Sequence, residues 1–184
     1  MNIEKMRLLV KELGDELGMR SDAASDEDVD DSAQQLAAEI ATHPFLKGMR
    51  PEHLRMLASQ GVRMRFDRDE PVLKEAHVAN RFYLIQEGKI ALQAPIEEIT
   101  PILIQTVGAG DELGWSWMFP ECYFHFDACA IEPTKAVGFW GPALLQQCVR
   151  DHDFGYELAM RMAEALTKQL MATREKLTDA YRKL

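Results

Sequence analysis

The spacing of apolar and polar residues changes several times along the chain. Apolar residues within 2–18 recur at helical spacing, which predicts an amphipathic helix in an N-terminal segment of residues 1–20. Residues 21–32 are small and acidic with almost nothing to bury, so we expect an acidic flexible linker there. Ser32 is then the expected N-cap of a helix over residues 33–42.

From residue 43 the pattern becomes that of a mainly β domain. A turn and a short helix over residues 51–59 come first, with Pro at the first helical position. Seven strand-like segments follow, separated by turn signals such as DRDE, EGK, GAGD and EPTK. The expected strands are Val62–Phe66, Pro71–Lys74, Phe82–Gln86, Lys89–Gln93, Ile99–Val107, Phe126–Ile131 and Ala136–Trp140. They predict a jelly-roll barrel, or double-stranded β-helix, in a unit of residues 33–152 that includes the leading helices.

The pattern becomes helical again after residue 142. A short helix is predicted over residues 142–149, and a long one within residues 153–184. The long helix repeats apolar or small residues at alternating steps of four and three, which is a heptad seam. At about 28 residues it spans roughly 42 Å, too long for so small a domain to cover. We therefore expect a coiled-coil homodimer through Ala159, Ala163, Leu166, Leu170, Thr173 and Leu177.

Composition narrows the class of protein and its partners. Hydrophobic residues make up 47% and charged residues 28%, as in ordinary globular proteins, and no run approaches the ~18 apolar residues of a membrane span. No signal-peptide pattern and no CxxC pair are found, so we expect a cytoplasmic protein with free thiols. The net charge of −9 falls to −3 without the six acidic residues of Asp22–Asp31, since 24 acidic residues then face 21 basic ones. This near-neutral balance predicts neither a nucleic-acid nor a membrane partner.

Residues 107–131, VGAGDELGWSWMFPECYFHFDACAI, are the candidate binding segment, here called the cassette. Its glycines allow backbone angles closed to other residues and let a small ligand approach the main chain. The runs FDRDEPVLKEAHVANRFYLIQEGKIAL and IQTVGAGDELGWSWMF together resemble the cyclic-nucleotide-binding domain family, and most closely the sensor domain of the catabolite activator protein superfamily. The resemblance covers about residues 43–177. It implies a jelly roll with a phosphate-binding cassette and a long trailing helix.

Both charged anchors implied by that resemblance are missing. In members that bind cyclic nucleotides, a Glu after the cassette glycine accepts the ribose 2′-hydroxyl, and an Arg about nine residues later pairs with the phosphate. Here Trp115 follows Gly114, and Phe124, or Tyr123 if the loop is shorter, occupies the place of the Arg. A loss of about 3–4 kcal/mol would weaken a micromolar site to about millimolar. We therefore expect weak cyclic-nucleotide binding at most.

Aromatic residues crowd the cassette instead, and two interpretations stay open. The first is a remodelled pocket for a flat or apolar ligand in a regulatory module that acts through its dimer interface or a protein partner. Its candidate ligand-binding residues are Gly114, Trp115, Ser116, Trp117, Tyr123, Phe124 and His125. The second is a structural or scaffolding protein whose relic pocket is filled by these rings, with Trp117, Phe119 and Phe126 as core residues.

No catalytic residue, metal ligand or cofactor is predicted. Cys122, His125 and Asp127 lack an oxyanion-hole motif, and the five histidines include no HxH pair of the kind that metal-dependent cupins need. A haem- or metal-binding roll, with His77 as a candidate by location, is a distant alternative. DNA-binding members of the superfamily continue past the long helix with a helix-turn-helix domain, whereas this chain stops at Leu184, so we expect no direct DNA recognition.

Overall fold

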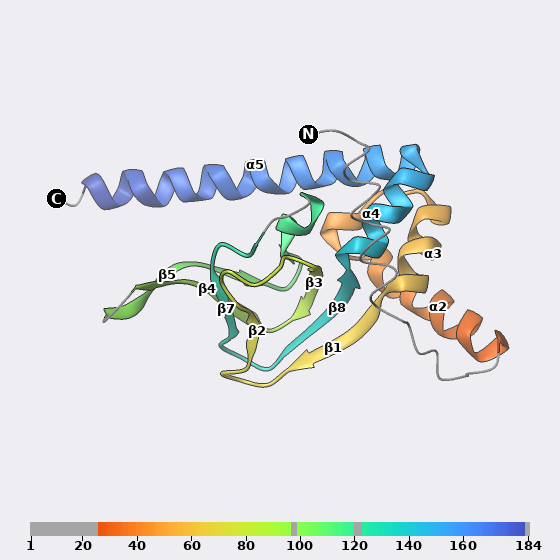
Figure 1. The fold of residues 1–184 in the computed structure, drawn as a ribbon, viewed down its shortest axis with the longest axis horizontal. Coiled ribbons are helices and arrows are strands. Elements are labelled where there is room, and N and C mark those ends of the chain that lie inside the picture. The colour runs from red at the N-terminus through yellow and green to blue at the C-terminus, as the bar shows by residue number, and fades with distance from the viewer. Residues whose placement is uncertain (1–25, 97–98, 120–122, 183–184) are drawn as a thin grey trace.

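The computed structural model describes residues 26–96, 99–119 and 123–182, and the predicted N-terminal helix lies outside these ranges. Helices gather at one end of two sheets, and the longest helix runs across them (Figure 1). The helical elements are α2 (Asp26–Ala41), η1 (Pro44–Leu46), α3 (Pro51–Gln60), η2 (Trp115–Met118), α4 (Gly141–Arg150) and α5 (His152–Arg182). The strands are β1 (Val62–Phe66), β2 (Pro71–Leu73), β3 (Arg81–Glu87), β4 (Lys89–Ile96), β5 (Ile99–Gly108), β6 (Glu112–Leu113), β7 (Asp127–Ala130) and β8 (Thr134–Trp140).

The strands form two four-stranded antiparallel sheets, which together make the roll. One sheet has the order β1-β8-β3-β6 and the other the order β2-β7-β4-β5, so neighbours in space are often distant in sequence. All seven expected strands are present, and the predicted jelly-roll fold is confirmed. Strand β6 was not predicted, because two residues are too few to establish an alternating pattern.

Strand β3 separates two hydrophobic cores because its side chains alternate between its faces. Tyr83 and Ile85 face the inside of the roll, where they pack with Leu92 and Ala128 of the second sheet. On the other face, Phe82 and Leu84 pack under the helices in a second core. The residues of that core that come from the helices include Leu36, Ile40, Leu57, Leu144, Phe154, Leu158 and Met162.

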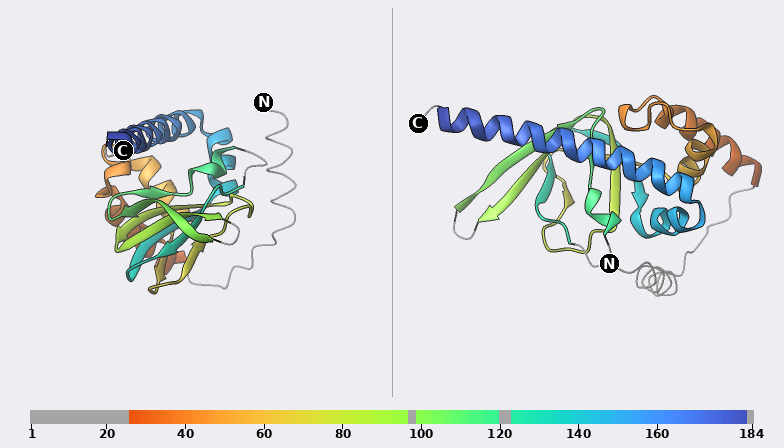
Figure 2. Two further views of the ribbon diagram at one scale, coloured as in Figure 1. Left: turned by 90° about the vertical axis from the view of Figure 1, so that its left-hand side faces the viewer. Right: turned by 90° about the horizontal axis from the view of Figure 1, so that it is seen from above.

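Helix α5 is packed on the body at its beginning and leaves it toward its end. Phe154, Leu158 and Met162 recur at steps of four and are at most 1% exposed. Further along, the helix passes over the β4–β5 hairpin and projects beyond the other helices (Figures 1 and 2). The long C-terminal helix predicted from the sequence is confirmed. None of the described helices combines the length and the apolar character that a membrane span requires.

The structure corrects the predicted boundary between linker and helix. Helix α2 begins at Asp26, so the last seven residues of the expected linker are helical and Ser32 is not an N-cap. Five of the six acidic residues that argued for a linker fall in the first turns of α2, and the sixth, Asp22, lies outside the described residues. Negative side chains are favourable there because the N-terminal end of a helix has a partial positive charge.

Candidate ligand-binding site

A cavity of about 680 Å³ opens into the roll beside the cassette. Three of its lining residues, Leu73, Tyr83 and Phe124, belong to the roll core and are nearly fully buried. The remaining lining residues come from β2, from the first residue of β3 and from the segment between these strands; they are Pro71, Val72, Lys74, Ala76, His77, Val78, Asn80 and Arg81. The cavity therefore has an apolar, partly aromatic floor and a polar mouth.

The cassette forms one wall of this cavity through backbone hydrogen bonds. The N–H of Phe124 donates to the carbonyl of His77, and the N–H of Ala76 donates to the carbonyl of Phe124, both at 3.0 Å. Val78 and Tyr123 add a β-bridge beside them. Any displacement of this part of the cassette therefore changes the shape of the cavity.

Gly114 holds the other end of the cassette against β3. It has a φ of +90°, and a Cβ atom at this position would lie 2.5 Å from the carbonyl oxygen of Arg81. Only glycine has both the backbone freedom and the small size that this contact requires. The start of η2 is therefore fixed directly beside a residue that lines the cavity.

The other candidate residues of η2 are packing residues. Ser116 and Trp117 are 1% and 3% exposed. The ring of Trp117 lies in the helical core, 6.1 Å from that of Phe82, on the face of β3 that points away from the cavity. The expectation that Trp117 and Phe126 are core residues is confirmed, whereas Phe119 is 46% exposed and that expectation is wrong.

Trp115 and His125 lie together with Phe119, and Trp115 also packs in part against the helical core. Trp115 contacts Phe119 edge-on at 6.4 Å and stacks obliquely with His125 at 6.3 Å. Tyr123 is 52% exposed. Phe124 is thus the one member of the predicted set found among the described residues that line the cavity. The cavity lining also includes Lys74, His77 and Arg81, which were not among the predicted ligand-binding residues and precede the start of the cassette by about 25 to 35 residues.

The two longer cations of the cavity have different partners. Lys74 donates to the Asp127 carboxylate at 2.6 Å, and the Glu75 N–H donates to the same carboxylate at 2.8 Å. Burial opposes ionisation of Asp127, but these hydrogen bonds outweigh it and lower its carboxyl pKa. Arg81 instead stacks its guanidinium 4.7 Å above the ring of Trp140.

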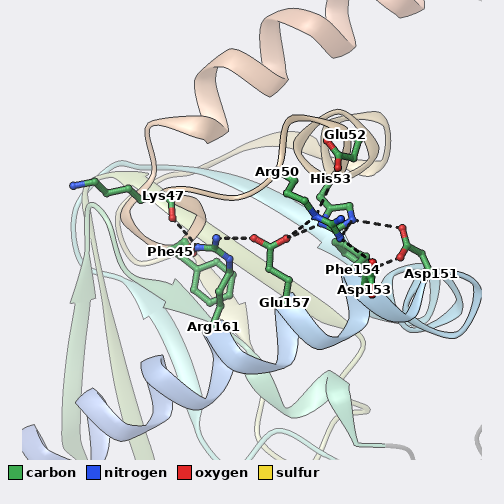
Figure 3. Close-up of polar contacts among 10 residues, drawn as sticks. All are labelled: Phe45, Lys47, Arg50, Glu52, His53, Asp151, Asp153, Phe154, Glu157 and Arg161. Atoms are coloured by element: carbon green, nitrogen blue, oxygen red, sulfur yellow. Dashed lines mark hydrogen bonds and ion pairs between the residues drawn. The ribbon is translucent and has the colours of Figure 1, made fainter.

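A partly buried polar network joins α3 to the start of α5 (Figure 3). His53 is 3% exposed; its Nδ1 donates to Glu157 at 2.7 Å, and Arg50 donates to its Nε2 at 3.0 Å. Arg161 binds the other oxygen of Glu157 and two carbonyls of residues 45–47. Burial opposes ionisation of Glu157, but the hydrogen bonds from Arg161 and His53 lower its carboxyl pKa. The network fixes α5 to the leading helices at this end.

Toward the middle of α5, the contact with the roll loosens into a groove of about 760 Å³. Glu112 of β6 and Lys168 of α5 line opposite sides, and burial raises the pKa of the Glu112 carboxyl. Gln169 donates to Gln105 at 3.3 Å across it. Because β6 leads directly into Gly114, this groove connects the cassette to the helix.

The predicted dimer residues lie mostly on the free side of α5. Ala159, Ala163, Leu170, Thr173 and Leu177 are exposed in the single chain, and Leu166 is half-buried. Large apolar residues broaden this stripe and are strongly exposed; they are Tyr156, Met160, Met171 and Tyr181. The face of α5 opposite Phe154, Leu158 and Met162 is therefore open to a partner.

The described residues offer no alternative chemistry of metal or thiol type. Within them, no group of His, Cys, Asp and Glu is placed to hold a metal ion. Cys129 and Cys148 are free thiols, and burial raises the pKa of Cys148 to about 11. A thiol with so high a pKa is a poor nucleophile at neutral pH.

The comparisons with known proteins that support the fold are comparisons of structure, not of sequence. No family model and no curated protein matches the sequence. A cyclic nucleotide-binding domain from Methylobacillus flagellatus KT has a TM-score of 0.69 at 20% identity, covering 83% of this chain and 85% of its own. A putative cyclic nucleotide-binding protein from Geobacter metallireducens GS-15 has a TM-score of 0.64 at 21% identity, covering 76% of this chain and 98% of its own. A regulatory subunit of a cAMP-independent protein kinase A from Trypanosoma cruzi, bound to guanosine, has a TM-score of 0.56 at 16% identity, covering 74% of this chain and 53% of its own.

Proposed function

We propose that this chain, which has the cyclic-nucleotide-binding fold, is a non-enzymatic regulatory module that senses a small ligand and signals as a homodimer or through a protein partner. The observation that supports this best is the cavity whose wall is hydrogen-bonded to the cassette. Occupancy would shift the cassette, and the groove beneath α5 would transmit the shift to the helix. The network at Glu157 would serve as the fixed pivot of that movement.

An ordinary cyclic nucleotide is not the ligand that we propose. Phe124, at the place where the resemblance implies Arg, is 5% exposed in the roll core and supplies no charge. Trp115, at the place of the Glu, packs against Phe119 and His125.

We expect the substitutions Leu170→Glu and Leu177→Glu together to convert dimers to monomers. In the single chain these residues are 65% and 59% exposed, and a paired helix would bury them. Burying uncompensated carboxylates costs several kcal/mol, and each 1.4 kcal/mol weakens association about tenfold, so a micromolar dimer would dissociate at micromolar concentrations of chain. Sedimentation velocity at about 10 μM chain, a concentration suited to micromolar association, measures the change.

The matched control for this pair is Ala172→Glu, which adds a carboxylate on the opposite side of α5, at the groove. We expect it to remain dimeric. A Leu170→Glu, Leu177→Glu variant with unchanged helical circular dichroism that still sediments as a dimer would contradict pairing through α5.

A scaffolding protein without a ligand is the second candidate. It is favoured by the burial of Trp117, Phe124 and Phe126, whose rings fill space in the two cores. The two functions differ in one observable: a sensor binds a small molecule in the roll cavity, and a scaffold does not.

A further inference from the structure

The cavity is lined by basic side chains that lie outside the cassette and were therefore not among the predicted ligand-binding residues. Its described lining contains Lys74, His77 and Arg81 and no acidic residue. Asp127 neutralises Lys74 through the 2.6 Å contact. No carboxylate of the described residues pairs with Arg81, which stacks on Trp140. The mouth of the cavity therefore presents one uncompensated guanidinium.

The alternation of β3 directs this guanidinium toward the roll. Arg81 shares its face of the strand with Tyr83, which lies in the roll core, whereas Phe82 points to the helices. Stacking on Trp140 restrains the side chain before any ligand arrives, which lowers the entropy lost on binding. A planar guanidinium with free N–H groups is well suited to a carboxylate or sulfonate.

The floor of the cavity selects the rest of the ligand. Leu73, Tyr83 and Phe124 present apolar and aromatic surface, and their exposed fractions are 4–5%. A flat apolar body would lie on this floor, with its anionic group at the mouth.

We propose that the roll cavity binds a singly charged organic anion with a flat apolar body, anchored by Arg81 of β3. This inference rests on the proposed sensing function and names the class of its ligand. The anchoring cation thus comes from the strand facing the cassette, whereas the cassette itself has no Lys or Arg between Glu112 and Lys135. One unpaired cation favours a single negative charge, because a second charge would be left without a partner.

Two fluorescent probes test this proposal on the full chain. The first, 1-anilinonaphthalene-8-sulfonate, is an aromatic monoanion, and N-phenyl-1-naphthylamine is its uncharged counterpart. We expect Arg81→Gln to weaken binding of the sulfonate about tenfold or more and to leave the neutral probe within about twofold. The matched control Arg65→Gln removes the same charge from the outer face of β1 and should change neither affinity.

Each other outcome overturns the assignment. Equal weakening of both probes by Arg81→Gln would mean that Arg81 shapes the cavity rather than pairing with the anion. An unchanged sulfonate affinity would exclude Arg81 as the anchor. Loss of sulfonate binding in the Leu170→Glu, Leu177→Glu variant would place the probe on α5.

The experiment distinguishes failure of the anion assignment from failure of the proposed sensing function. If cyclic AMP at about 1 mM displaces both probes but Arg81→Gln affects neither, the roll still binds a ligand and only the anion assignment is wrong. If both probes bind α5 alone, ligand sensing by the roll fails as well.

Discussion

Replacing Gly114 by alanine is expected to lower the free energy of unfolding by about 3 kcal/mol. The left-handed backbone at φ +90° costs an alanine about 1–2 kcal/mol. The added Cβ would also lie 2.5 Å from the carbonyl oxygen of Arg81, a main-chain atom of a central strand. Relieving that contact displaces β3 or η2, at a further cost of about 1–3 kcal/mol. Urea unfolding at one fixed protein concentration measures the loss.

Substitutions at two other glycines distinguish the cost of the left-handed backbone from the cost of the contact with Arg81. Gly48 has a φ of +76° with no atom within 4 Å of an added Cβ, so Gly48→Ala should show the backbone cost alone, about 1 kcal/mol. At Gly108 the backbone is not left-handed and the nearest atom is 3.5 Å away, so Gly108→Ala should be close to neutral. If Gly114→Ala is as mild as Gly48→Ala, the contact with Arg81 does not constrain the cassette.

Phe154→Ala is expected to cost about 3–5 kcal/mol and to loosen the start of α5. The Phe154 ring is 0% exposed and meets His53 edge-on at 5.4 Å, beneath the network that joins α3 to α5. Removing the ring leaves a cavity at the point where the helix is fixed to the body. Unfolding monitored by circular dichroism gives the loss of stability, and hydrogen exchange in residues 154–162 reports the loosening.

Phe154→Leu is the control, because it keeps most of the buried volume and should cost less than about 1.5 kcal/mol. His152→Ala, at an exposed position of the same turn, should stay within about 0.5 kcal/mol of the parent. A Phe154→Ala variant as stable as His152→Ala would show that α5 is held by the polar network rather than by the buried ring.

The elements of this fold could be predicted from the sequence wherever a regular pattern repeats over several residues. The alternation in β1, the continuous apolar run of β3 and the helical period of α5 each extend over enough residues to outweigh local exceptions. The start of α2 could not be predicted in this way. There, residues 26–32 suit a solvated linker and a first helical turn equally well, and only the continuing helix distinguishes them.

For the candidate site, too, some features could be predicted from the sequence and others could not. The sequence by itself determined the roll, the long helix with its apolar seam, and the absence of Lys and Arg from the cassette, since all three follow from residue type and spacing. It could not separate Trp117 from Phe124, although both are buried aromatic residues of one segment. Tertiary structure decided that Trp117 packs under the helices and Phe124 lines the cavity. It also brought Arg81 beside Gly114, because pairing of strands distant in sequence sets which side chains line one cavity.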